Sequence, residues 1–299
     1  MLELKNAFKN KFANVLFDEP MKKHTTFKIG GNADIFVIPK DRQEIIDSIK
    51  LCKEFEAPFY IIGNGSNLLV GDGGIKGAVI QIFKNMGNIK VNGNVIKTES
   101  GALLSSVSKK ALDEGLTGLE FASGIPGTVG GGVCMNAGAY GGEMKDIISK
   151  VVVLRNGEIL ELSNEEAGFE YRNSRILKNS MIVLETEMVL KKGNINEIKE
   201  KTREFNRLRS EKQPLEFPSA GSAFKRPEGY FAGKLIMDSG LRGYSVGGAS
   251  ISEKHCGFIV NKGGATAKDV ITLIEDVKKI VNDKFGVILE PEIRFIGNF

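Results

Sequence analysis

The sequence predicts an α+β fold, for three reasons. Between residues 58 and 163 it holds many short, apolar, β-prone runs with few helical stretches among them. A charged, helix-prone segment, 193–213, then ends at Pro214. A second region follows, with a long amphipathic helix and a final apolar strand. A doubly wound sheet would place a helix between nearly every pair of strands, so these observations favour α+β.

The first expected helix spans residues 41–56. It opens with Asp41 and carries Glu44 three positions later, which is the arrangement of a capping box. Ile45 and Ile49 fall on one face of such a helix. The segment is therefore expected to pack one apolar face against a sheet.

Strands are expected where apolar and β-branched residues cluster between turn residues. Asn92-Gly93 and Asn156-Gly157 separate such runs, and the second dipeptide lies within VVVLRNGEILEL, a strong hairpin pattern. A helix at about 102–114 interrupts the series. The expected strands are PFYII (58–62), NLLV (67–70), AVIQIF (78–83) and VIKTES (95–100).

Three parts are expected along the chain. The middle part is the connecting helix, and the last part holds a helix from Thr266 to Phe285 that Gly286 ends. The final segment, VILEPEIRFIG, is expected to be a strand. The parts are a first region at 1–192 (subdomains at about 1–84 and 85–192, completed by the C-terminal strand), the connecting helix at 193–213, and a second domain at 214–299.

Composition and charge exclude several classes of function. The 41 Lys and Arg residues barely exceed the 37 Asp and Glu residues, so bulk charge does not indicate nucleic-acid binding. A mildly basic surface does suit small anionic ligands. No apolar run has the length of a signal peptide or a membrane span, so we expect a cytoplasmic protein without a membrane partner.

The cysteines and histidines indicate neither a disulfide framework nor a metal site. Cys52, Cys134 and Cys256 are odd in number and far apart, which favours a reducing compartment. His255 lies beside Cys256 without further ligand-type neighbours, so no metal is expected. His24 is expected to be structural.

One glycine-rich loop, IIGNGSNLLV at 61–70, interrupts an apolar run. It fails the dinucleotide fingerprint, because Leu68 stands where the third glycine should be and no helix follows. GYFAGKL at 229–235 fails as a P-loop, because the first glycine is one residue too close and Leu235 replaces the metal-binding hydroxyl. No G-x-S-x-G elbow occurs, so a serine hydrolase is set aside.

A second glycine-rich segment, GIPGTVGGGVCMNAGAYGG at 124–142, makes a cofactor site the better interpretation. So much glycine costs folding entropy, and a tight turn cluster at a sheet edge is the plain alternative. Two such segments, both with Asn and with Ser or Thr, suit a cage of backbone amides around a long anionic ligand. A pyrophosphate with a flat ring system attached fits this description.

Six motifs in the same order carry a family resemblance. They are HTTFKIGGNAD (24–34), GNGSNLLV (63–70), GIPGTVGGGVCMNAGAYG (124–141), YRNS (171–174), PSAGSAFKRP (218–227) and EPEIRFIG (290–297). From about Lys22 to its end, the sequence closely resembles the UDP-N-acetylenolpyruvoylglucosamine reductase family. Because NSRILKNSMIVLETEMVL follows Arg172 directly, the sequence resembles the shorter form of the family, without the tyrosine-bearing insertion.

The resemblance implies a fold and a cofactor. The fold is an FAD-binding domain of the vanillyl-alcohol oxidase and p-cresol methylhydroxylase type, followed by a smaller α+β substrate-binding domain. FAD is expected to be the bound cofactor and NADPH the electron donor. The residues expected to bind FAD are Gly63, Asn64, Gly65, Ser66, Asn67, Leu68, Gly124, Ile125, Pro126, Gly127, Thr128, Gly130, Gly131, Asn136, Ala137, Gly138, Ala139 and Tyr140.

The resemblance also implies a reaction, the reduction of UDP-N-acetylglucosamine enolpyruvate to UDP-N-acetylmuramate in peptidoglycan precursor synthesis. Arg172 would bind the carboxylate as a planar fork, and Glu292 would polarise it if its pKa is raised. Ser222 would donate the proton. Substrate contacts are also possible from Lys212, Lys225 and His255, and the two lysines are candidates to stabilise the serine alkoxide. A monomer is favoured.

Each catalytic candidate also has a plain interpretation. Ser222 follows Gly221 in a turn-like PSAGS. Arg172 alone would most often be an ion-paired surface residue, and Glu292 in an alternating strand would face solvent. Two rival functions stay open: a flavin oxidase of the same cofactor fold, and a nucleotide-binding module without catalysis.

Overall fold

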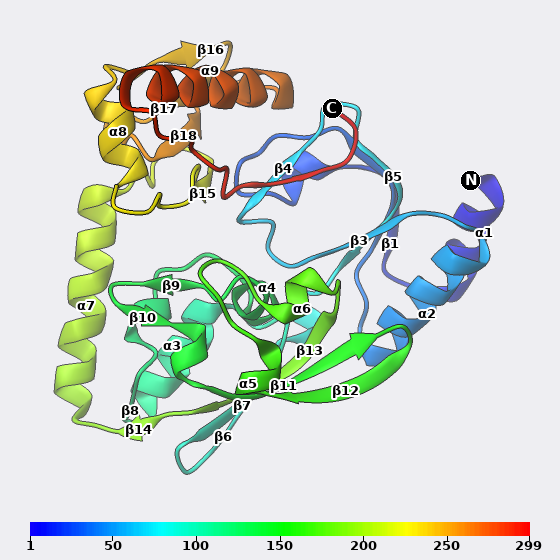
Figure 1. Cartoon of the computed structure of the whole chain (residues 1–299). Coiled ribbons are helices and arrows are strands. Elements are labelled where there is room, and N and C mark those ends of the chain that lie inside the picture. Colours follow the sequence, from blue (N-terminus) through cyan, green and yellow to red (C-terminus); the bar gives the residue numbers. More distant parts are fainter.

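The computed structural model describes all residues, 1–299, as a lower body and a smaller upper domain joined by one long helix. That helix, α7 (Ile195–Lys212), runs along one side of the molecule and links the two (Figure 1). It coincides with the segment expected to connect them. None of the helices is both long and apolar enough to span a membrane.

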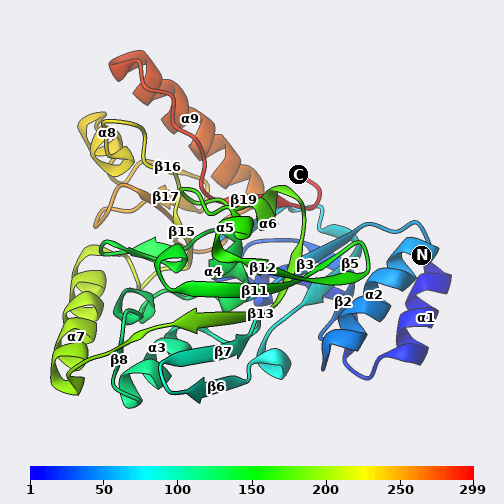
Figure 2. The same cartoon turned by 60° about the horizontal axis from the view of Figure 1, so that its bottom comes forward.

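The first sheet belongs to the N-terminal part of the lower body. Its strand order is β1-β2-β5-β3, and β2, β5 and β3 run parallel to one another. Helices α1 and α2 pack beside it, as the two views in Figures 1 and 2 show. The elements are α1 (Leu2–Lys11), β1 (Val15–Pro20), β2 (Asn32–Val37), α2 (Arg42–Glu54), β3 (Phe59–Ile62) and β5 (Ile75–Gln81).

Helix α2 begins as the sequence predicts. Asp41 Oδ1 accepts a hydrogen bond from the backbone N–H of Glu44, 2.9 Å away. The Glu44 carboxylate accepts from the amide of Lys40 in place of Asp41, so the return bond of the expected capping box is displaced by one residue. Ile45 and Ile49 are buried in the core between the helices and the sheet.

The second sheet is antiparallel throughout, with order β12-β11-β13-β7-β6. Its β11–β12 hairpin turns at Asn156-Gly157, where both residues have positive φ (52° and 92°). This is the geometry of the primed turns that Asn-Gly favours, so the hairpin prediction is confirmed. The strands are β6 (Ile89–Asn92), β7 (Val95–Glu99), β11 (Ile148–Arg155), β12 (Glu158–Ser163) and β13 (Ile182–Val189).

Short helices and strands complete the lower body around this sheet. The glycine-rich segment contains helix α4 (Val129–Cys134), which Thr128 caps through its side chain. The other elements are α3 (Leu104–Asp113), β8 (Leu116–Thr117), β9 (Gly138–Ala139), β10 (Gly142–Glu143), α5 (Asn164–Ala167), α6 (Arg175–Lys178), β14 (Lys191–Lys192) and the 3₁₀ turns Met21–Lys23, Lys84–Met86, Glu120–Ala122 and Met144–Asp146.

The upper domain is a small antiparallel sheet of order β15-β18-β17-β16 with two helices. Helix α9 (Ala267–Phe285) starts at a complete capping box and ends at Gly286 in the left-handed region, as expected. The remaining elements are β15 (Ser219–Ser222), α8 (Ala232–Asp238), β16 (Ser245–Val246), β17 (Ala249–Ile251) and β18 (Phe258–Asn261).

The C-terminal segment returns from the upper domain to the lower body. Only β19 (Arg294–Ile296) is a strand, and it pairs in parallel with β4 (Leu68–Val70). The expectation of a strand over the whole of VILEPEIRFIG is therefore wrong for its first half. Pro291 forms only an isolated antiparallel bridge with Phe224, flanked by hydrogen bonds from the Lys225 amide to the Glu290 carbonyl and from the Glu292 amide to the Ala223 carbonyl. This type of pair needs no amide hydrogen at residue 291, so the strand is absent because the segment has no continuous partner strand here, not because of the proline.

Several contacts fix the upper domain on the lower body. Asp72 accepts hydrogen bonds from the first amides of α9, those of Ala267 and Lys268, at 2.8 and 3.0 Å. Phe27 is fully buried in the core of the upper domain although it comes from the N-terminal region. The two bodies are thus joined by packing and by hydrogen bonds as well as by helix α7.

Candidate active site

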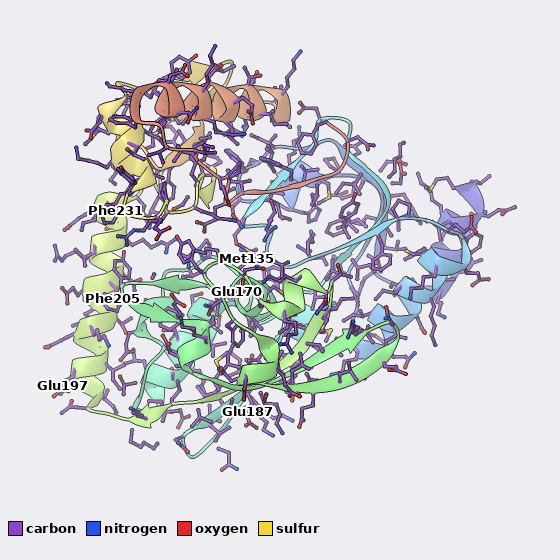
Figure 3. All side chains as sticks on the ribbon, in the orientation of Figure 1. Met135, Glu170, Glu187, Glu197, Phe205 and Phe231 are labelled. Carbon is purple, nitrogen blue, oxygen red and sulfur yellow. The ribbon has the colours of Figure 1, made fainter.

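A cavity of about 990 Å³ lies where the lower body meets the upper domain. This volume is at the upper end of the range for small-molecule sites. Both glycine-rich segments line it, and so do β15 and the C-terminal segment. Met135, which also lines it, lies on the face of the lower body toward the upper domain (Figure 3).

The loop from Gly63 to Asn67 presents unused backbone donors to this cavity. The amides of Asn64, Gly65, Ser66 and Asn67 donate to no acceptor in the protein. The loop is held from behind: Thr26 N–H donates to the Gly65 carbonyl, and Asn64 Nδ2 donates to the carbonyl of Pro126. Successive free amides in such a loop form an anion-binding concavity.

The second glycine-rich segment lies directly beside this loop and adds further donors. Leu103 and Thr128 form a non-hydrogen-bonded antiparallel pair, in which neither residue donates its amide to the other. The backbone N–H groups of Gly127 and Thr128 have no acceptor in the protein. Gly131, in α4, leaves open space beside the helix: a Cβ placed at this position would have only one neighbour within 4 Å, Thr128 Oγ1 at 3.6 Å. The two segments therefore bring unused backbone amides to one cavity; that these amides bind an anion stays a prediction.

Unpaired buried polar groups also face the cavity. Ser100 Oγ and Gln213 Oε1 line it and have no hydrogen-bond partner in the protein. Arg209, one turn before Gln213 on α7, lines it as well; burial lowers the pKa of its guanidinium, and no carboxylate offsets this. Buried groups of this kind are costly unless a ligand pairs them. The lining therefore fits a large anionic cofactor with hydrogen-bonding ring atoms.

The charge of the lining has one sign almost throughout. Its only carboxylate is Glu292, whereas its cations are Lys50, Lys53, Arg172, Arg209 and Arg294. A cavity with an excess of positive charge and free amides concentrates anionic ligands.

The three catalytic candidates meet in this cavity, although they come from three parts of the chain. Arg172, Ser222 and Glu292 all line it. Arg172 Nε donates to Glu292 Oε1 at 3.0 Å, and its NH2 donates to the carbonyl of Gly138 at 3.1 Å. Arg172 also has φ of 52°, an unusual backbone conformation of the kind that gathers at functional sites.

Glu292 is largely but not fully buried, with 15% of its side chain exposed, and it is tied to both sides of the site through its backbone. Its amide donates to the Ala223 carbonyl at 2.9 Å, and its carbonyl accepts from Asn67 Nδ2 at 3.2 Å. Burial raises the pKa of its carboxyl, and Arg172 offsets part of this rise. The surroundings of Glu292 therefore raise the pKa of its carboxyl, as its expected role requires. The alternative that Glu292 simply faces solvent does not hold, because most of its side chain is buried.

Ser222 ends a strand that is distorted just before it. Ser219 pairs with Val260 and Ser222 with Phe258, so β15 carries one more residue than β18 in this interval. Gly221, with φ of 81°, absorbs the bulge. Bulges beside functional sites commonly re-aim a side chain.

Some expected residues lie outside the cavity lining. Most of the expected FAD-binding residues line it, but Gly124, Asn136 and Tyr140 do not. Asn136 is fully buried and holds Glu143, the Glu170 carbonyl and the Lys145 amide with its side chain. Tyr140 stacks on Phe205 of α7, a residue labelled in Figure 3. These arrangements support the fold around the cavity.

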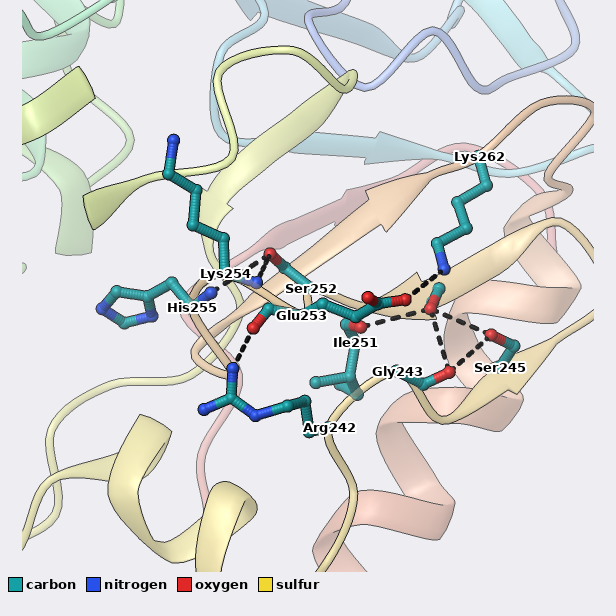
Figure 4. A network of polar contacts seen from close by, with 10 residues as sticks. Arg242, Gly243, Ser245, Ile251, Ser252, Glu253, Lys254, His255 and Lys262 are labelled. Carbon is teal, nitrogen blue, oxygen red and sulfur yellow. Dashed lines mark hydrogen bonds and ion pairs between the residues drawn. The ribbon is translucent and has the colours of Figure 1, made fainter. Parts of the chain in front are cut away.

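The three expected substrate contacts also lie outside it. Lys225 pairs with Glu290 at 2.9 Å. His255 Nδ1 accepts from the amide of Gly257, and its loop is held by Ser252 Oγ, which accepts from the amides of Lys254 and His255 (Figure 4). Burial lowers the pKa of His255, with Lys212 adding to the effect. Lys212 and Lys225 are close to Ser222 in sequence, but neither shares its cavity.

Other cavity residues gave no signal as motifs. Lys50 and Lys53 lie on a helix that the sequence marks only as amphipathic, Arg209 lies on the connecting helix α7, and Gln213 is the extended residue that ends it. The sequence gives no signal for either Arg209 or Gln213. Arg294 lies two positions after Glu292 in the EIR motif.

The fold and the cavity define a two-domain protein of the class that binds a dinucleotide cofactor, with the cavity at the junction of the two domains. Comparison with known families agrees: residues 33–163 match the family described as FAD binding domain, and residues 213–296 match the family described as UDP-N-acetylenolpyruvoylglucosamine reductase, C-terminal domain.

Full-length relatives give the family. UDP-N-acetylenolpyruvoylglucosamine reductase of Caldanaerobacter subterraneus subsp. tengcongensis is 54% identical over 96% of this chain and 95% of its own length. The protein of the same name from Lachnoclostridium phytofermentans is 53% identical over 99% of this chain and 96% of its own. The chain belongs to the UDP-N-acetylenolpyruvoylglucosamine reductase family, which confirms the resemblance seen in its motifs.

Solved structures agree with this assignment. The crystal structure of UDP-N-acetylenolpyruvylglucosamine reductase from Thermus caldophilus is 37% identical, with a TM-score of 0.81, and covers 94% of this chain and 97% of its own. Alkyldihydroxyacetonephosphate synthase, at 16% identity and a TM-score of 0.50 over 64% of this chain and 40% of its own, shares the fold alone. The prediction of an FAD-dependent oxidoreductase with a vanillyl-alcohol oxidase type domain and a smaller α+β domain is confirmed.

Proposed function

We propose that this chain catalyses the NADPH-dependent reduction of UDP-N-acetylglucosamine enolpyruvate to UDP-N-acetylmuramate, with FAD as its bound cofactor, in peptidoglycan precursor synthesis. One observation carries the proposal. A single cavity brings together the unused amides of Asn64–Asn67 and the group formed by Arg172, Ser222 and Glu292. The enzyme is expected to be a cytoplasmic monomer, and its product is expected to be used in cell-wall growth and cell division.

The cofactor is expected to lie along the two glycine-rich segments. The amides of Asn64–Asn67, Gly127 and Thr128 would hold its diphosphate, because they are the unused donors of the cavity. Ser100, Arg209 and Gln213 would pair with its polar ring atoms, since each lacks a partner of its own. When bound, FAD would supply the hydride chemistry of the reaction, with NADPH as the hydride donor and the terminal carbon of the enolpyruvyl group as the acceptor.

The carboxylate of the substrate is expected at Arg172. The guanidinium already uses Nε on Glu292 and one terminal nitrogen on the Gly138 carbonyl, which fixes its plane and leaves its other donors for a ligand. Charge that develops on the carboxylate and the adjacent carbon during reduction would be stabilised there. Fixed donors aimed at developing charge are typically the largest catalytic contribution.

The proton is expected to come from Ser222. After hydride reaches the terminal carbon, the adjacent carbon must take one proton, and the Ser222 hydroxyl can supply it. The alkoxide left behind needs nearby positive charge, for which the cavity offers Arg172, Arg209 and Arg294 rather than Lys212 or Lys225. A raised pKa at Glu292 would keep a proton on that carboxyl and limit the negative charge beside the substrate.

The division of the chain follows from these roles. We propose that residues 1–192 with the C-terminal strand bind FAD, that 193–213 connects, and that 214–299 covers the substrate. Parallel pairing of β19 with β4 supports this, because it attaches the C-terminal segment to the strand that follows the phosphate loop.

The spectrum of the purified protein tests the function. A yellow protein that NADPH bleaches, and that UDP-N-acetylglucosamine enolpyruvate then recolours without oxygen, is the expected result. Recolouring by oxygen alone, together with turnover of alcohols, would indicate a flavin oxidase instead. A colourless protein that binds nucleotide without turnover would indicate a binding module and overturn the proposal.

A further inference from the structure

Thr26 makes two hydrogen bonds to two different parts of the chain. Its backbone N–H donates to the carbonyl of Gly65, in the loop of free amides, at 3.2 Å. Its hydroxyl donates to the carbonyl of Ser219, the first residue of β15, at 2.7 Å. One residue of the HTTFKIGGNAD motif thus bridges the proposed diphosphate loop and the strand that ends at Ser222.

The loop side of this bridge is tightly packed. Gly65 has φ of 62°, and a Cβ at this position would overlap the carbonyl oxygen of His24 and lie 3.0 Å from the Cα of Thr25. The phosphate loop and the segment before Thr26 are therefore in direct backbone contact. A shift of the loop would move Thr26 with it.

The residues around Thr26 are also fixed to the sheet of the upper domain that contains β15. Phe27, directly after Thr26, is fully buried in the core of the upper domain. Its carbonyl accepts a hydrogen bond from Asn261 Nδ2 of β18, the partner strand of β15, at 3.2 Å. The Thr26 hydroxyl adds the bond that reaches β15 itself, so it sets the position of Ser219 relative to the loop.

The bulge of β15 makes this anchor important for Ser222. Between Ser219 and Ser222 the ladder with β18 loses its register, and Gly221 has a positive φ. An irregular, glycine-containing stretch has little stiffness of its own. Its direction depends on the fixed ends, and the Ser219 carbonyl held by Thr26 is one of them.

We propose that Thr26 is a positioning residue for the reaction: its hydroxyl ties the strand that carries Ser222 to the loop that holds the FAD diphosphate. The proposal rests on the function proposed above, because it concerns how the proton donor is placed over the cofactor. A plain alternative is that Thr26 only adds stability, like many half-buried threonines. The two differ in which step of the reaction slows.

The matched variants are Thr26→Val, which removes the hydroxyl at nearly constant volume, Thr26→Ser, which keeps it, and Thr25→Val as the control. The Thr25 hydroxyl makes only a local bond, to the Ile29 carbonyl at 3.3 Å. The holoproteins are compared in rapid-mixing experiments on flavin reduction by NADPH and, separately, on reoxidation of the reduced protein by UDP-N-acetylglucosamine enolpyruvate. Flavin content and the unfolding midpoint are measured for each.

Thr26→Val is expected to slow reoxidation by the substrate by about ten-fold to a hundred-fold, since small misplacements of a catalytic group cost this much. Its flavin content and its reduction by NADPH should match the wild type. The solvent deuterium isotope effect on reoxidation should grow, because proton delivery then limits the step. Thr26→Ser should recover most of the rate, and Thr25→Val should behave as wild type.

Other outcomes overturn the proposal. A Thr26→Val protein with a lower unfolding midpoint but wild-type reoxidation, or with both half-reactions slowed alike, would reduce Thr26 to a structural residue. If Thr26→Val does not fold, Thr26→Ala serves in its place with the same expectations. A wild-type protein that NADPH reduces but the enolpyruvyl nucleotide does not reoxidise would instead refute the proposed function, and the positioning proposal with it.

Discussion

Arg172 Nε and Glu292 Oε1 are 3.0 Å apart, although 120 positions separate the two residues in the sequence. Neither side chain is fully exposed, and Glu292 is the more buried of the two. The pair joins the lower body to the returning C-terminal segment and faces the same cavity as Ser222. Substitutions at this pair therefore test most directly whether Arg172, Ser222 and Glu292 act as proposed.

The first prediction concerns pH and stability. Burial raises the pKa of Glu292 in the folded state, although Arg172 offsets part of the rise. A carboxyl with a raised folded pKa favours folding while it is protonated, below its unfolded pKa, and this contribution is lost as pH rises through the folded pKa. The difference in unfolding free energy, wild type minus Glu292→Gln, should therefore fall from about pH 4.5 upward.

Urea unfolding of both proteins at a series of pH values measures this difference. Glutamine keeps the shape of the side chain and removes its titration, so other groups cancel in the comparison. A difference that rises with pH in this window would mean that Arg172 dominates and that the carboxyl is ionised in the folded protein. That outcome would also remove the proposed role of Glu292 as a protonated neighbour of the substrate.

The second prediction concerns the proton donor. Ser222→Ala should leave reduction by NADPH intact and slow the reoxidation by UDP-N-acetylglucosamine enolpyruvate by about 10²–10⁴-fold, the usual worth of general acid catalysis. Separate rapid-mixing measurements of the two half-reactions check this. If both fall together, the role given to Ser222 is wrong. Thr26 is expected to act on the same half-reaction, to a smaller extent.

The third prediction concerns the shape of the cation at position 172. Arg172→Lys keeps one positive charge but cannot reach Glu292 and the Gly138 carbonyl at the same time as a planar guanidinium does. The rate of substrate reduction should fall by about 10²-fold or more, as when a fixed donor to developing charge is removed. Steady-state kinetics with varied substrate should show the loss mainly in kcat. A loss confined to KM would indicate simple substrate binding.

Much of the fold was predictable because its signals are local. Asn156-Gly157 marks a hairpin turn through positive φ, and Thr266 and Gly286 mark the two ends of α9. The strand expected through Pro291 failed because this segment finds only an isolated bridge to Phe224 before it pairs with β4 from Arg294 on, and sequence alternation does not show which partner strand is available. Local chemistry thus fixes elements well and their exact ends less well.

The site was predictable in a different way. Glycine composition indicated the two loops, and the family resemblance named Arg172, Ser222 and Glu292. Arg209 was missed because it lies on a charged helix that looks solvent-exposed in sequence, and Gln213 because it is the residue that ends this helix; only the fold brings both to the cavity. Lys212 and Lys225 were named by closeness in sequence to Ser222, and neither lines the cavity. Burial raises the pKa of Glu292, however, and Lys225 is close enough to that carboxyl for its charge to offset part of the rise.

The fourth prediction uses two glycines with nearly the same backbone. Gly65 and Gly93 have φ of 62° and 65°, so alanine at either position costs about 1–2 kcal/mol of backbone strain. A Cβ at Gly93 meets nothing within 4 Å, whereas a Cβ at Gly65 overlaps the His24 carbonyl. Gly65→Ala must therefore displace the loop from Gly63 to Asn67, while Gly93→Ala leaves the cavity unchanged.

The expected result is that Gly65→Ala purifies with much less flavin than the wild type and Gly93→Ala with the same amount. The ratio of flavin to protein absorbance, and a titration of the apoprotein with FAD, measure this. Because both variants carry the same kind of backbone strain, a selective loss assigns the effect to the loop. Equal flavin content in all three proteins would show that Asn64–Asn67 do not hold the diphosphate, since a loop forced out of place could not keep its amides on it.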